Sequence, residues 1–266
     1  MQTITLNDKR KMPIIGLGTW RLTGKECEEA VLSALKLGYR HIDTAKYYDN
    51  EEAVGKAIKR CGISRKEIFV TTKIWEDEHA DPEAALDASL KRLGLDFVDL
   101  YLIHSPVDER LETWKIFEKL QKKGKCKSIG VSNFTIKHLE QLMKSSKAIP
   151  VVNQVEFNPF LYQKELLEYC LKKGIALEAY CPIARTKKFS NKIIKEVSKT
   201  YNKTPAQIML RWSLQKGVIV IPKSANNERQ KENLDVFNFE INSIGVKKLD
   251  NLNENFRMCW DPTDEE

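Results

Sequence analysis

Short apolar runs of strand length alternate with amphipathic stretches of helix length along almost the whole chain. The hydrophobic period switches between about two and about 3.6 residues at each step, which is typical of a repeated strand–helix unit. Seven strands are predicted in HIDTA, IFVTTK, VDLYLIH, SIGVSN, VVNQVEF, ALEAY and VIVIPK, and an earlier eighth near Ile14 and Ile15. Helices are predicted over residues 24–37, 51–60, 82–93, 135–145, 164–173 and 205–216, from about 226, and over 240–253.

Each of these seven strands ends on, or carries near its end, a residue suited to polar chemistry. The residues are Asp43, Lys73, His104, Ser132 with Asn133, Gln154, Tyr180 and Lys223. Strands buried on both faces are nearly continuous apolar runs, and in a barrel the loops at the C-terminal strand ends carry the catalytic groups. A doubly wound sheet would collect such residues mainly near one switch point. The pattern therefore favours a barrel.

The two ends of the chain add features to this barrel. TITLNDKRKMP alternates around a polar Asn7-Asp8 turn, which predicts a hairpin that plugs the barrel floor. FRMCWDPTDEE after the last helix is expected to be a short tail that folds Trp260 over the barrel mouth. The predicted fold is α/β: a (β/α)8 TIM barrel forming one domain over residues 1–266, with an N-terminal β-hairpin and a short C-terminal tail.

Proline and glycine mark the predicted helix boundaries. Asp81 before Pro82 and Thr204 before Pro205 predict two helix starts. Six glycines lie where helices should end, and capping explains them without any chemistry. They are Gly38, Gly62, Gly94, Gly124, Gly174 and Gly217.

Composition and charge narrow the classes of function. The net charge of +7 comes from 44 basic and 37 acidic side chains, and the basic ones are scattered over predicted helix faces. No zinc-finger spacing or RNA-recognition motif accompanies them, so we expect no nucleic-acid partner. Six cysteines without a CxxC pair, and an N-terminus without an apolar core, predict a reduced, cytoplasmic protein. No apolar run approaches the roughly 20 residues of a membrane span, and no metal site is expected.

Four polar residues on neighbouring predicted strands form the densest chemical pattern. Asp43 ends its strand, Tyr48 follows on the next loop, and Lys73 ends the next strand. A carboxylate holds a nearby lysine charged, and a charged lysine lowers the pKa of a nearby tyrosine from about 10. Tyr48 would then donate and recover a proton near neutral pH, while His104 would polarise a substrate oxygen. Each residue alone has an ordinary structural explanation, but the four together favour a catalytic site.

Ordered motifs run through essentially all 266 residues. They are GLGTW at 16–20, DTAKYYDNEEAVG at 43–55, TKIW at 72–75, LIHSP at 102–106, GVSNF at 130–134, NQVEFNP at 153–159, AYCP at 179–182, and IPKS followed by Arg229, Glu232 and Asn233. With these motifs the chain resembles the aldo-keto reductases, NAD(P)H-dependent enzymes with a barrel fold, and in particular their compact microbial members. The resemblance implies that Tyr48 is the general acid and that Lys73, paired with Asp43, tunes it. It also implies that His104 orients the carbonyl.

The loops after strands seven and eight of such barrels commonly bind phosphate. Lys223 and Ser224 end the eighth predicted strand, and Arg229 follows at the start of a helix. A lysine and an arginine fork suit the 2′-phosphate of an adenosine, which predicts NADP(H) as the cofactor, with NADPH preferred over NADH. The resemblance implies in addition that Glu232 and Asn233 face the adenine.

Other strand ends offer groups for the nicotinamide half of the cofactor. Hydroxyl and amide groups that could hold the carboxamide are those of Ser132, Asn133 and Gln154, and Tyr180 offers a ring for stacking. A buried amide bonded to neighbouring backbone is the alternative interpretation of Gln154. The remaining predicted cofactor residues lie in the turn after the first strand and at the end of the second: Gly18, Thr19, Trp20 and Asp43.

The residues expected around the substrate are mostly aromatic. They are Trp20, Tyr48, Trp75, His104 and Ser105. Ser105 stands where many members of the family have tryptophan, which should make the pocket wider and more polar. The short tail lacks the loop that larger relatives use for steroids, so steroids are not expected as substrates.

These features predict NADPH-dependent reduction of aldehydes, small ketones or dicarbonyls to alcohols by hydride transfer, with Tyr48 as general acid. Two alternatives remain open: a barrel that binds NADP(H) as a regulatory or structural subunit, and a phosphate-ester enzyme that uses Lys223, Ser224 and Arg229. The second would leave Tyr180 and the set of Asp43, Tyr48 and Lys73 unexplained. Family analogy predicts a monomer. Cys181, beside the predicted nicotinamide site, is a candidate for oxidation, with plain packing as the alternative.

Overall fold

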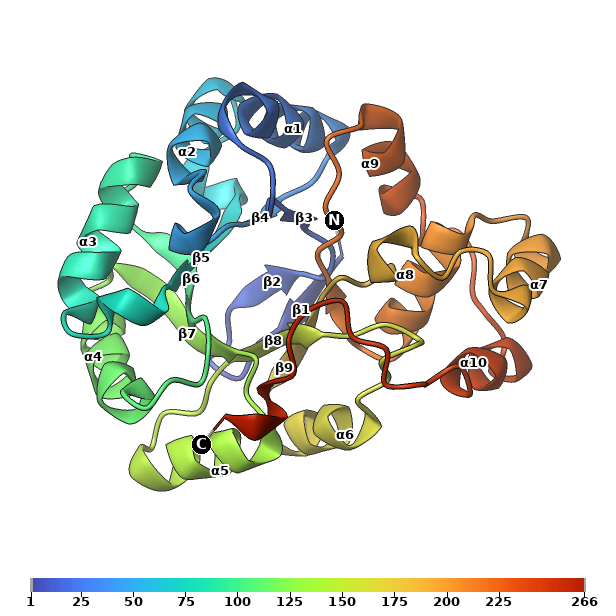
Figure 1. Ribbon diagram of the computed structural model, residues 1–266. Helices are drawn as coiled ribbons and strands as arrows, with labels where there is room; N and C mark the ends of the chain where they lie inside the picture. The colour runs from blue at the N-terminus through green and yellow to red at the C-terminus, as the bar shows by residue number, and fades with distance from the viewer. Residues whose placement is uncertain (1, 266) are drawn as a thin grey trace.

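The computed structural model describes residues 2–265, and its centre is an eight-stranded parallel sheet curled into a barrel (Figure 1). Gly16 N donates to the carbonyl oxygen of Val220 at 2.9 Å. Gly18 pairs with Lys223 in a parallel bridge, so the first and last strands of the sheet meet and the predicted barrel is confirmed. In sheet order the strands are β3 Leu17–Gly18, β4 His41–Asp43, β5 Phe69–Ile74, β6 Val98–Ile103, β7 Cys126–Ser132, β8 Val152–Glu156, β9 Ala176–Tyr180 and β10 Ile219–Val220.

Helices form the outer layer around the strands (Figure 1). Asp81 and Thr204 cap two of them as predicted, each accepting a hydrogen bond from the backbone N–H three residues later, at 3.0 and 3.2 Å. Gly94 ends the helix that Asp81 begins, and Gly174 ends another, both in the left-handed conformation with φ of 62° and 71°. The helices are α1 Gly24–Leu37, α2 Glu51–Arg60, α3 Pro82–Leu93, α4 Arg110–Lys122, α5 Ile136–Ser145, α6 Lys164–Lys173, α7 Lys192–Tyr201, α8 Pro205–Gln215, α9 Asn227–Leu234 and α10 Ser243–Asp250.

Three helices differ from the sequence-based prediction. For α4 only the end, at Gly124, was predicted and no range was given. α7 was not predicted, because its buried stripe is limited to Ile194 and Val197 and it is an addition to the strand–helix alternation. It packs on α8 and α10 at the periphery of the barrel. α10 is shorter than the predicted 240–253, since Asn242 accepts from Gly245 N at 2.8 Å and so fixes the start of the helix.

The N-terminal hairpin closes one end of the barrel interior. Strands β1 (Thr3–Thr5) and β2 (Lys11–Pro13) are antiparallel and lie across the centre of the ring (Figure 1). Leu6 and Met12 are buried against inward-facing residues of the barrel strands, which confirms the predicted plug. We call this set the floor cluster: Leu6, Met12, Phe69, Leu100, Leu102, Val151, Val152, Ala176 and Ile219.

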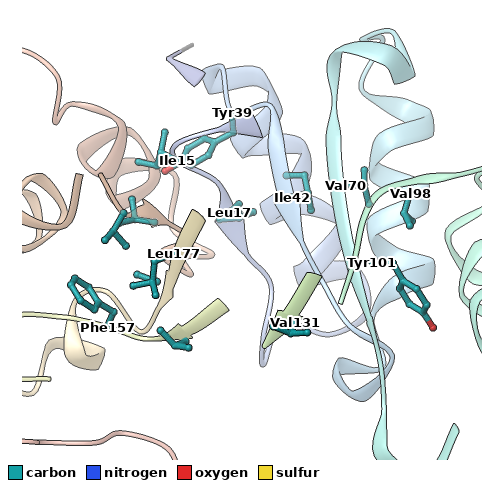
Figure 2. Packing of buried hydrophobic residues seen from close by; sticks show 14 of the residues in the cluster. Ile15, Leu17, Tyr39, Ile42, Val70, Val98, Tyr101, Val131, Phe157 and Leu177 are labelled. Atoms are coloured by element: carbon teal, nitrogen blue, oxygen red, sulfur yellow. The ribbon is translucent and has the colours of Figure 1, made fainter. Parts of the chain in front are cut away.

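A second and larger apolar cluster fills the space between strands and helices (Figure 2). Val70 on β5 and Tyr101 on β6 belong to it, and the ring of Tyr101 stacks on Phe117 of α4 at 4.3 Å. Because side chains alternate along a strand, the neighbours of Val70 at positions 69 and 71 face the barrel interior instead. The helices therefore pack on the outer face of the strands, and the alternate strand residues, such as those at positions 69 and 71, fill the barrel interior.

The C-terminal tail returns across the strand ends. Glu156, the last residue of β8, accepts hydrogen bonds from the backbone N–H groups of Met258 and Cys259 at 2.7 and 3.0 Å. Trp260 keeps 42% of its surface exposed, so the backbone around Cys259 rather than the Trp260 ring makes the closest approach to the mouth. Among residues 2–265, no helix combines the length and apolarity that a membrane crossing needs.

Candidate active site

Asp43 and Lys73 form a buried ion pair at the C-terminal end of the barrel interior. They lie on the neighbouring strands β4 and β5, and both side chains are almost wholly excluded from solvent. Lys73 Nζ donates to Asp43 Oδ1 and Oδ2 at 2.8 and 2.9 Å, and to the carbonyl oxygen of Thr44 at 2.9 Å. These bonds compensate the buried charges and fix the position of the ammonium group.

Tyr48 reaches the same ammonium group from a short helical turn, Lys46–Tyr48, that follows β4. Lys73 Nζ donates to the Tyr48 hydroxyl at 3.2 Å. Burial, reinforced by the negative charge of Asp43, raises the pKa of Tyr48 well above its ordinary value. The sequence-based expectation of a lowered pKa is therefore wrong, because it counted the lysine and left out desolvation. A raised pKa keeps the phenol protonated, which is the state that a general acid requires.

His104 follows β6 and lies beside Tyr48, with the two rings edge-to-face and their centroids 5.7 Å apart. Trp75 packs against the other side of the imidazole at 5.0 Å. Burial, and then the positive charge of Lys73, lowers the pKa of His104 well below its ordinary value. The ring is therefore neutral at pH 7, with one nitrogen that donates and one that accepts. Within residues 2–265, its Nδ1 has no hydrogen-bond partner.

Gln154 connects the ion pair to a second buried carboxyl group. Its amide nitrogen donates to Asp43 Oδ2 and to Glu178 Oε2, both at 2.8 Å. Glu178 in turn approaches His41, with Oε1 3.6 Å from Nε2. Burial, together with the charge of Asp43, raises the pKa of Glu178 to about 8. Burial also lowers the pKa of His41 to about 3, so both groups are neutral at pH 7 and this contact is not an ion pair.

Glu178 and His41 are site residues that the sequence-based reasoning missed. The signal for Glu178 was present, since ALEAY is an apolar strand interrupted by a carboxylate two positions before Tyr180 and hence on the same face. Gln154 was expected either to bind the nicotinamide carboxamide or to be a buried amide bonded to backbone. Neither expectation was complete, because its amide nitrogen donates to two side chains. Its oxygen is the end that a carboxamide could still bind.

The predicted nicotinamide residues form one hydrogen-bonded group. Ser132 Oγ donates to the carbonyl oxygen of Gln154 at 2.8 Å. Asn133 has a left-handed backbone, with φ of 64°, and its amide nitrogen donates to the carbonyl oxygen of His104 at 2.9 Å. The Tyr180 hydroxyl donates to Asn133 Oδ1 at 2.8 Å. These bonds link the Tyr180 hydroxyl, through the Asn133 side chain, to the backbone of His104.

The turn at Gly18, Thr19 and Trp20 has a clear structural role. A Cβ on Gly18 would lie only 2.7 Å from the carbonyl oxygen of Ile221, so the closing strands require glycine there. Thr19 Oγ1 donates to the backbone carbonyl of Asp43 at 2.9 Å. Arg185 lies over the Trp20 ring with its Cζ 4.4 Å from the centroid, which fixes the indole at the edge of the site.

The predicted phosphate residues lie between β10 and the start of α9. Lys223 and Arg229 are both exposed, and Asn226 caps α9 by accepting from Arg229 N at 3.0 Å. Glu232 accepts from Thr204 Oγ1 at 2.8 Å, which ties α9 to α8. Ser224 and Asn233 are buried. Two exposed cationic side chains therefore lie near the N-terminus of α9.

Aromatic rings form the predicted substrate wall. Trp75 is flanked by Tyr47, a residue that was not predicted, with the two rings stacked at 3.9 Å. Tyr47 keeps 53% of its surface exposed, which makes it the outer end of this wall. Ser105 is buried next to His104. In the part of the chain described here, no group of three His, Cys, Asp or Glu side chains is arranged to hold a metal ion.

The model of the aldo/keto reductase family matches residues 14–254. The chain belongs to this family. It is 46% identical over 264 residues to glyoxal reductase of Bacillus subtilis (strain 168), covering 98% of this chain and 96% of that protein. It is 44% identical over 264 residues to methylglyoxal reductase DkgA of Escherichia coli (strain K12), covering 97% and 96%.

A solved relative supports the same fold. The crystal structure of Bombyx mori aldo-keto reductase AKR2E4 in complex with NADP superposes with a TM-score of 0.91 and 38% identity. The match covers 96% of this chain and 94% of that one. This chain is therefore an oxidoreductase of the aldo-keto reductase family, with a protonated phenol, a fixed ammonium group and a neutral imidazole gathered at the mouth of its barrel.

Proposed function

We propose that this aldo-keto reductase uses NADPH to reduce aldehydes, small ketones or dicarbonyls to alcohols, with Tyr48 as the general acid. The observation that carries the proposal is the 3.2 Å contact between Lys73 Nζ and the Tyr48 hydroxyl. Asp43 and the Thr44 carbonyl hold the ammonium group in place, so its positive charge lies next to the phenol oxygen of Tyr48. Such preorganised charge is what proton transfer to a developing alkoxide requires.

Each catalytic residue has a defined part in this reaction. NADPH, when bound, supplies a hydride to the carbonyl carbon. Tyr48 donates its proton to the carbonyl oxygen as negative charge develops there, and Lys73 stabilises the phenolate that remains. The neutral imidazole of His104 donates a hydrogen bond to the same oxygen and orients it. The raised pKa of Tyr48 therefore keeps the proton available, and Lys73 acts once the proton has left.

The cofactor preference follows from the surface charges near α9. Lys223 and Arg229 would bind the 2′-phosphate, which favours NADPH over NADH, and Glu232 and Asn233 would face the adenine. Around the nicotinamide, the Gln154 amide oxygen and the Ser132 hydroxyl would hold the carboxamide. The Tyr180 ring would stack on the pyridine face.

Small dicarbonyls are the first substrates to test. Two relatives carry the names glyoxal reductase and methylglyoxal reductase, which supports this choice. The small side chain of Ser105 beside His104 also suits a compact, polar substrate.

The proposed function is tested by following NADPH absorbance with glyoxal, methylglyoxal, short aliphatic aldehydes and aromatic aldehydes. Tyr48→Phe should lower kcat by on the order of 10²-fold or more, because the proton donor is gone. Tyr47→Phe is the matched control, since Tyr47 contributes a stacked ring rather than a hydroxyl to the site. If Tyr48→Phe turns over at the wild-type rate, Tyr48 is not the acid. Tight NADPH binding without turnover would favour a nucleotide-binding subunit instead.

Arg229→Ala tests the predicted phosphate contact. Losing a charge-assisted hydrogen bond should raise the Kd for NADPH roughly tenfold or more and leave the Kd for NADH almost unchanged. Lys231→Ala removes a charge from the same helix and should weaken both cofactors little. Tryptophan fluorescence quenching measures the Kd of both cofactors for the wild type and for each variant, and equal weakening of NADPH and NADH by Arg229→Ala would exclude the 2′-phosphate role.

A further inference from the structure

Two cysteines that are far apart in the sequence meet at the barrel mouth. Cys181 follows Tyr180 directly at the end of β9, and Cys259 lies in the C-terminal tail. Both carry free thiols and both are partly exposed. The two sulfurs are close enough to interact, since each shifts the pKa of the other. Arg185 completes the group, because its Nη2 donates to Cys259 Sγ at 3.1 Å. We call these three residues the dithiol site.

Each sulfur is held in place by the surrounding fold. The tail is fixed by Glu156, which binds the backbone N–H groups of Met258 and Cys259. The loop that carries Cys181 and Arg185 has an unusual backbone, since both residues have φ in the left-handed region, at 48° and 46°. Non-glycine residues adopt this region only when surrounding contacts enforce it. The dithiol site is therefore a built contact between the tail and the loop after β9.

The electrostatics of the dithiol site make the two sulfurs unequal. The interaction with Cys181, together with the nearby Arg185 guanidinium, holds the pKa of Cys259 below its ordinary value. The same interaction raises the pKa of Cys181. A thiolate is the nucleophilic form of cysteine, and a neighbouring cation favours it. Because the Arg185 guanidinium bonds to Cys259 Sγ at 3.1 Å, Cys259 is the sulfur placed to attack first, and Cys181 is placed to react second.

The other cysteines lack this arrangement. Cys27, Cys126 and Cys170 are buried in the apolar core, where desolvation raises the pKa of each to about 12. Cys61 is partly exposed, but its thiol donates to the carbonyl oxygen of Ile58 at 3.0 Å. Cys61 is thus a natural control for exposure without a partner thiol.

We propose that Cys181 and Cys259 form a reversible disulfide when the protein meets a hydroperoxide such as hydrogen peroxide. The Cys259 thiolate attacks one peroxide oxygen, the O–O bond breaks, and hydroxide leaves, which gives a sulfenic acid on Cys259. The Cys181 sulfur then attacks the Cys259 sulfur, the S–O bond breaks, and the Cys181 proton converts the departing hydroxide to water. The first hydroxide takes up the proton that Cys259 released on becoming a thiolate, so with hydrogen peroxide two thiols and one peroxide give one disulfide and two waters.

The disulfide would join the tail covalently to the loop after β9, immediately next to Tyr180. This consequence rests on the proposed function, in which Tyr180 stacks on the nicotinamide. A loop that is tied to the tail exchanges cofactor more slowly, so oxidation should lower kcat several-fold and a dithiol reductant should restore it. Formation of the bond itself does not depend on the reaction that the enzyme catalyses.

Peptide mapping after peroxide treatment tests the bond directly. The wild type should yield one cross-linked peptide pair containing Cys181 and Cys259, with the loss of two hydrogen atoms, and dithiothreitol should release it. Cys181→Ser should stop at the sulfenic or sulfinic acid on Cys259, whereas Cys61→Ser should cross-link like the wild type. Recovery of Cys181 and Cys259 as free thiols, or oxidation of Cys259 alone in the wild type, would overturn the proposal.

Arg185→Met tests the role of the guanidinium. Cross-linking should slow roughly tenfold, since the cation that favours the thiolate is gone. Arg21→Met is the matched control, because Arg21 also lies over the Trp20 ring, at 4.3 Å, but has no bond to a cysteine sulfur. Equal rates in both variants would show that Arg185 does not activate Cys259.

The effect on activity is tested separately, by comparing NADPH turnover before and after oxidation in the wild type and in Cys181→Ser. A disulfide that forms but leaves kcat unchanged would overturn the proposed effect on activity alone.

Discussion

The floor and the mouth of the barrel interior are built from the same strands but from different kinds of side chain. β5 contributes Phe69 to the floor cluster and, four residues later, Lys73 to the mouth. β9 contributes Ala176 to the floor, Glu178 above it and Tyr180 at the strand end. Every second residue of a strand faces the same side, so the interior is divided into layers along the barrel axis.

The floor and the mouth of the interior differ in what they contribute to the protein. The floor consists of apolar side chains closed by Met12, and its contribution to folding is the burial of hydrocarbon. The mouth contains a single buried ion pair, Asp43 with Lys73, while Glu178 and His41 next to it are neutral at pH 7. Changes at the floor should therefore alter stability alone, whereas changes at the mouth should alter activity as well.

Lys73→Met should have the largest effect, because it affects both properties. Turnover should fall by on the order of 10²-fold or more, since the cation beside Tyr48 is lost. The free energy of unfolding should fall by about 3–5 kcal/mol, because Asp43 is left buried without its partner. Urea unfolding and steady-state kinetics measure the two effects.

The double variant Asp43→Asn/Lys73→Met sharpens this result. Removing both charges should restore much of the lost stability and none of the lost activity. Lys125→Met, which removes two ion pairs on the surface, with Glu83 and Asp87, should change little in either measurement. A double variant that is as unstable as Lys73→Met would show that the buried charge of Asp43 is not the cause.

Met12→Ala should have the next largest effect, and on stability alone. Truncating this fully buried side chain should lower the free energy of unfolding by about 2–5 kcal/mol. Met12→Leu, which conserves volume, should cost less than about 1.5 kcal/mol. In both variants the folded enzyme should keep its kcat, so a large loss of kcat in Met12→Leu would contradict the separation of floor and mouth.

Glu178→Gln should have the smallest effect, a change in how stability depends on pH between about pH 4.5 and pH 8. Because the pKa of Glu178 is raised from 4.5 to about 8 on folding, the folded state binds more protons than the unfolded state between these values. Stability therefore falls as pH rises through this window, by at most about 1.4 kcal/mol per pH unit. The pKa of His41 is lowered from 6.5 to about 3, so its effect on stability has the opposite sign. His41 destabilises the fold only as the pH falls below 6.5.

Urea unfolding at pH 7.5 and pH 8.5 reports mainly on Glu178, since the imidazole of His41 is largely neutral in both the folded and the unfolded state at these pH values. The wild type should lose stability between the two pH values, and Glu178→Gln should lose less. Glu165→Gln, on the exposed face of α6, should follow the wild type. An equal loss in all three proteins would assign the change to other groups.

The sequence predicted which residues form the centre of the site, but it did not predict all of their properties. Asp43, Tyr48, Lys73 and His104 were predicted together, and the structure places their side chains around one point. Their order along consecutive strands was enough, because neighbouring parallel strands bring their C-terminal ends together. The direction of the Tyr48 pKa shift was wrong, since desolvation depends on how deeply the phenol is enclosed, which no spacing reveals.

The sequence by itself determined the barrel, the plugged floor and the polar strand ends, because alternation and period are local properties that any chain with this pattern must express. α7 escaped prediction, since its short stripe is stabilised by the neighbouring α8 and α10. Only the tertiary structure decided that Gln154 bridges Asp43 to Glu178, and that Cys259 returns across the mouth to meet Cys181. Such contacts join residues far apart in the chain, and their geometry is set by how the strands and the tail pack.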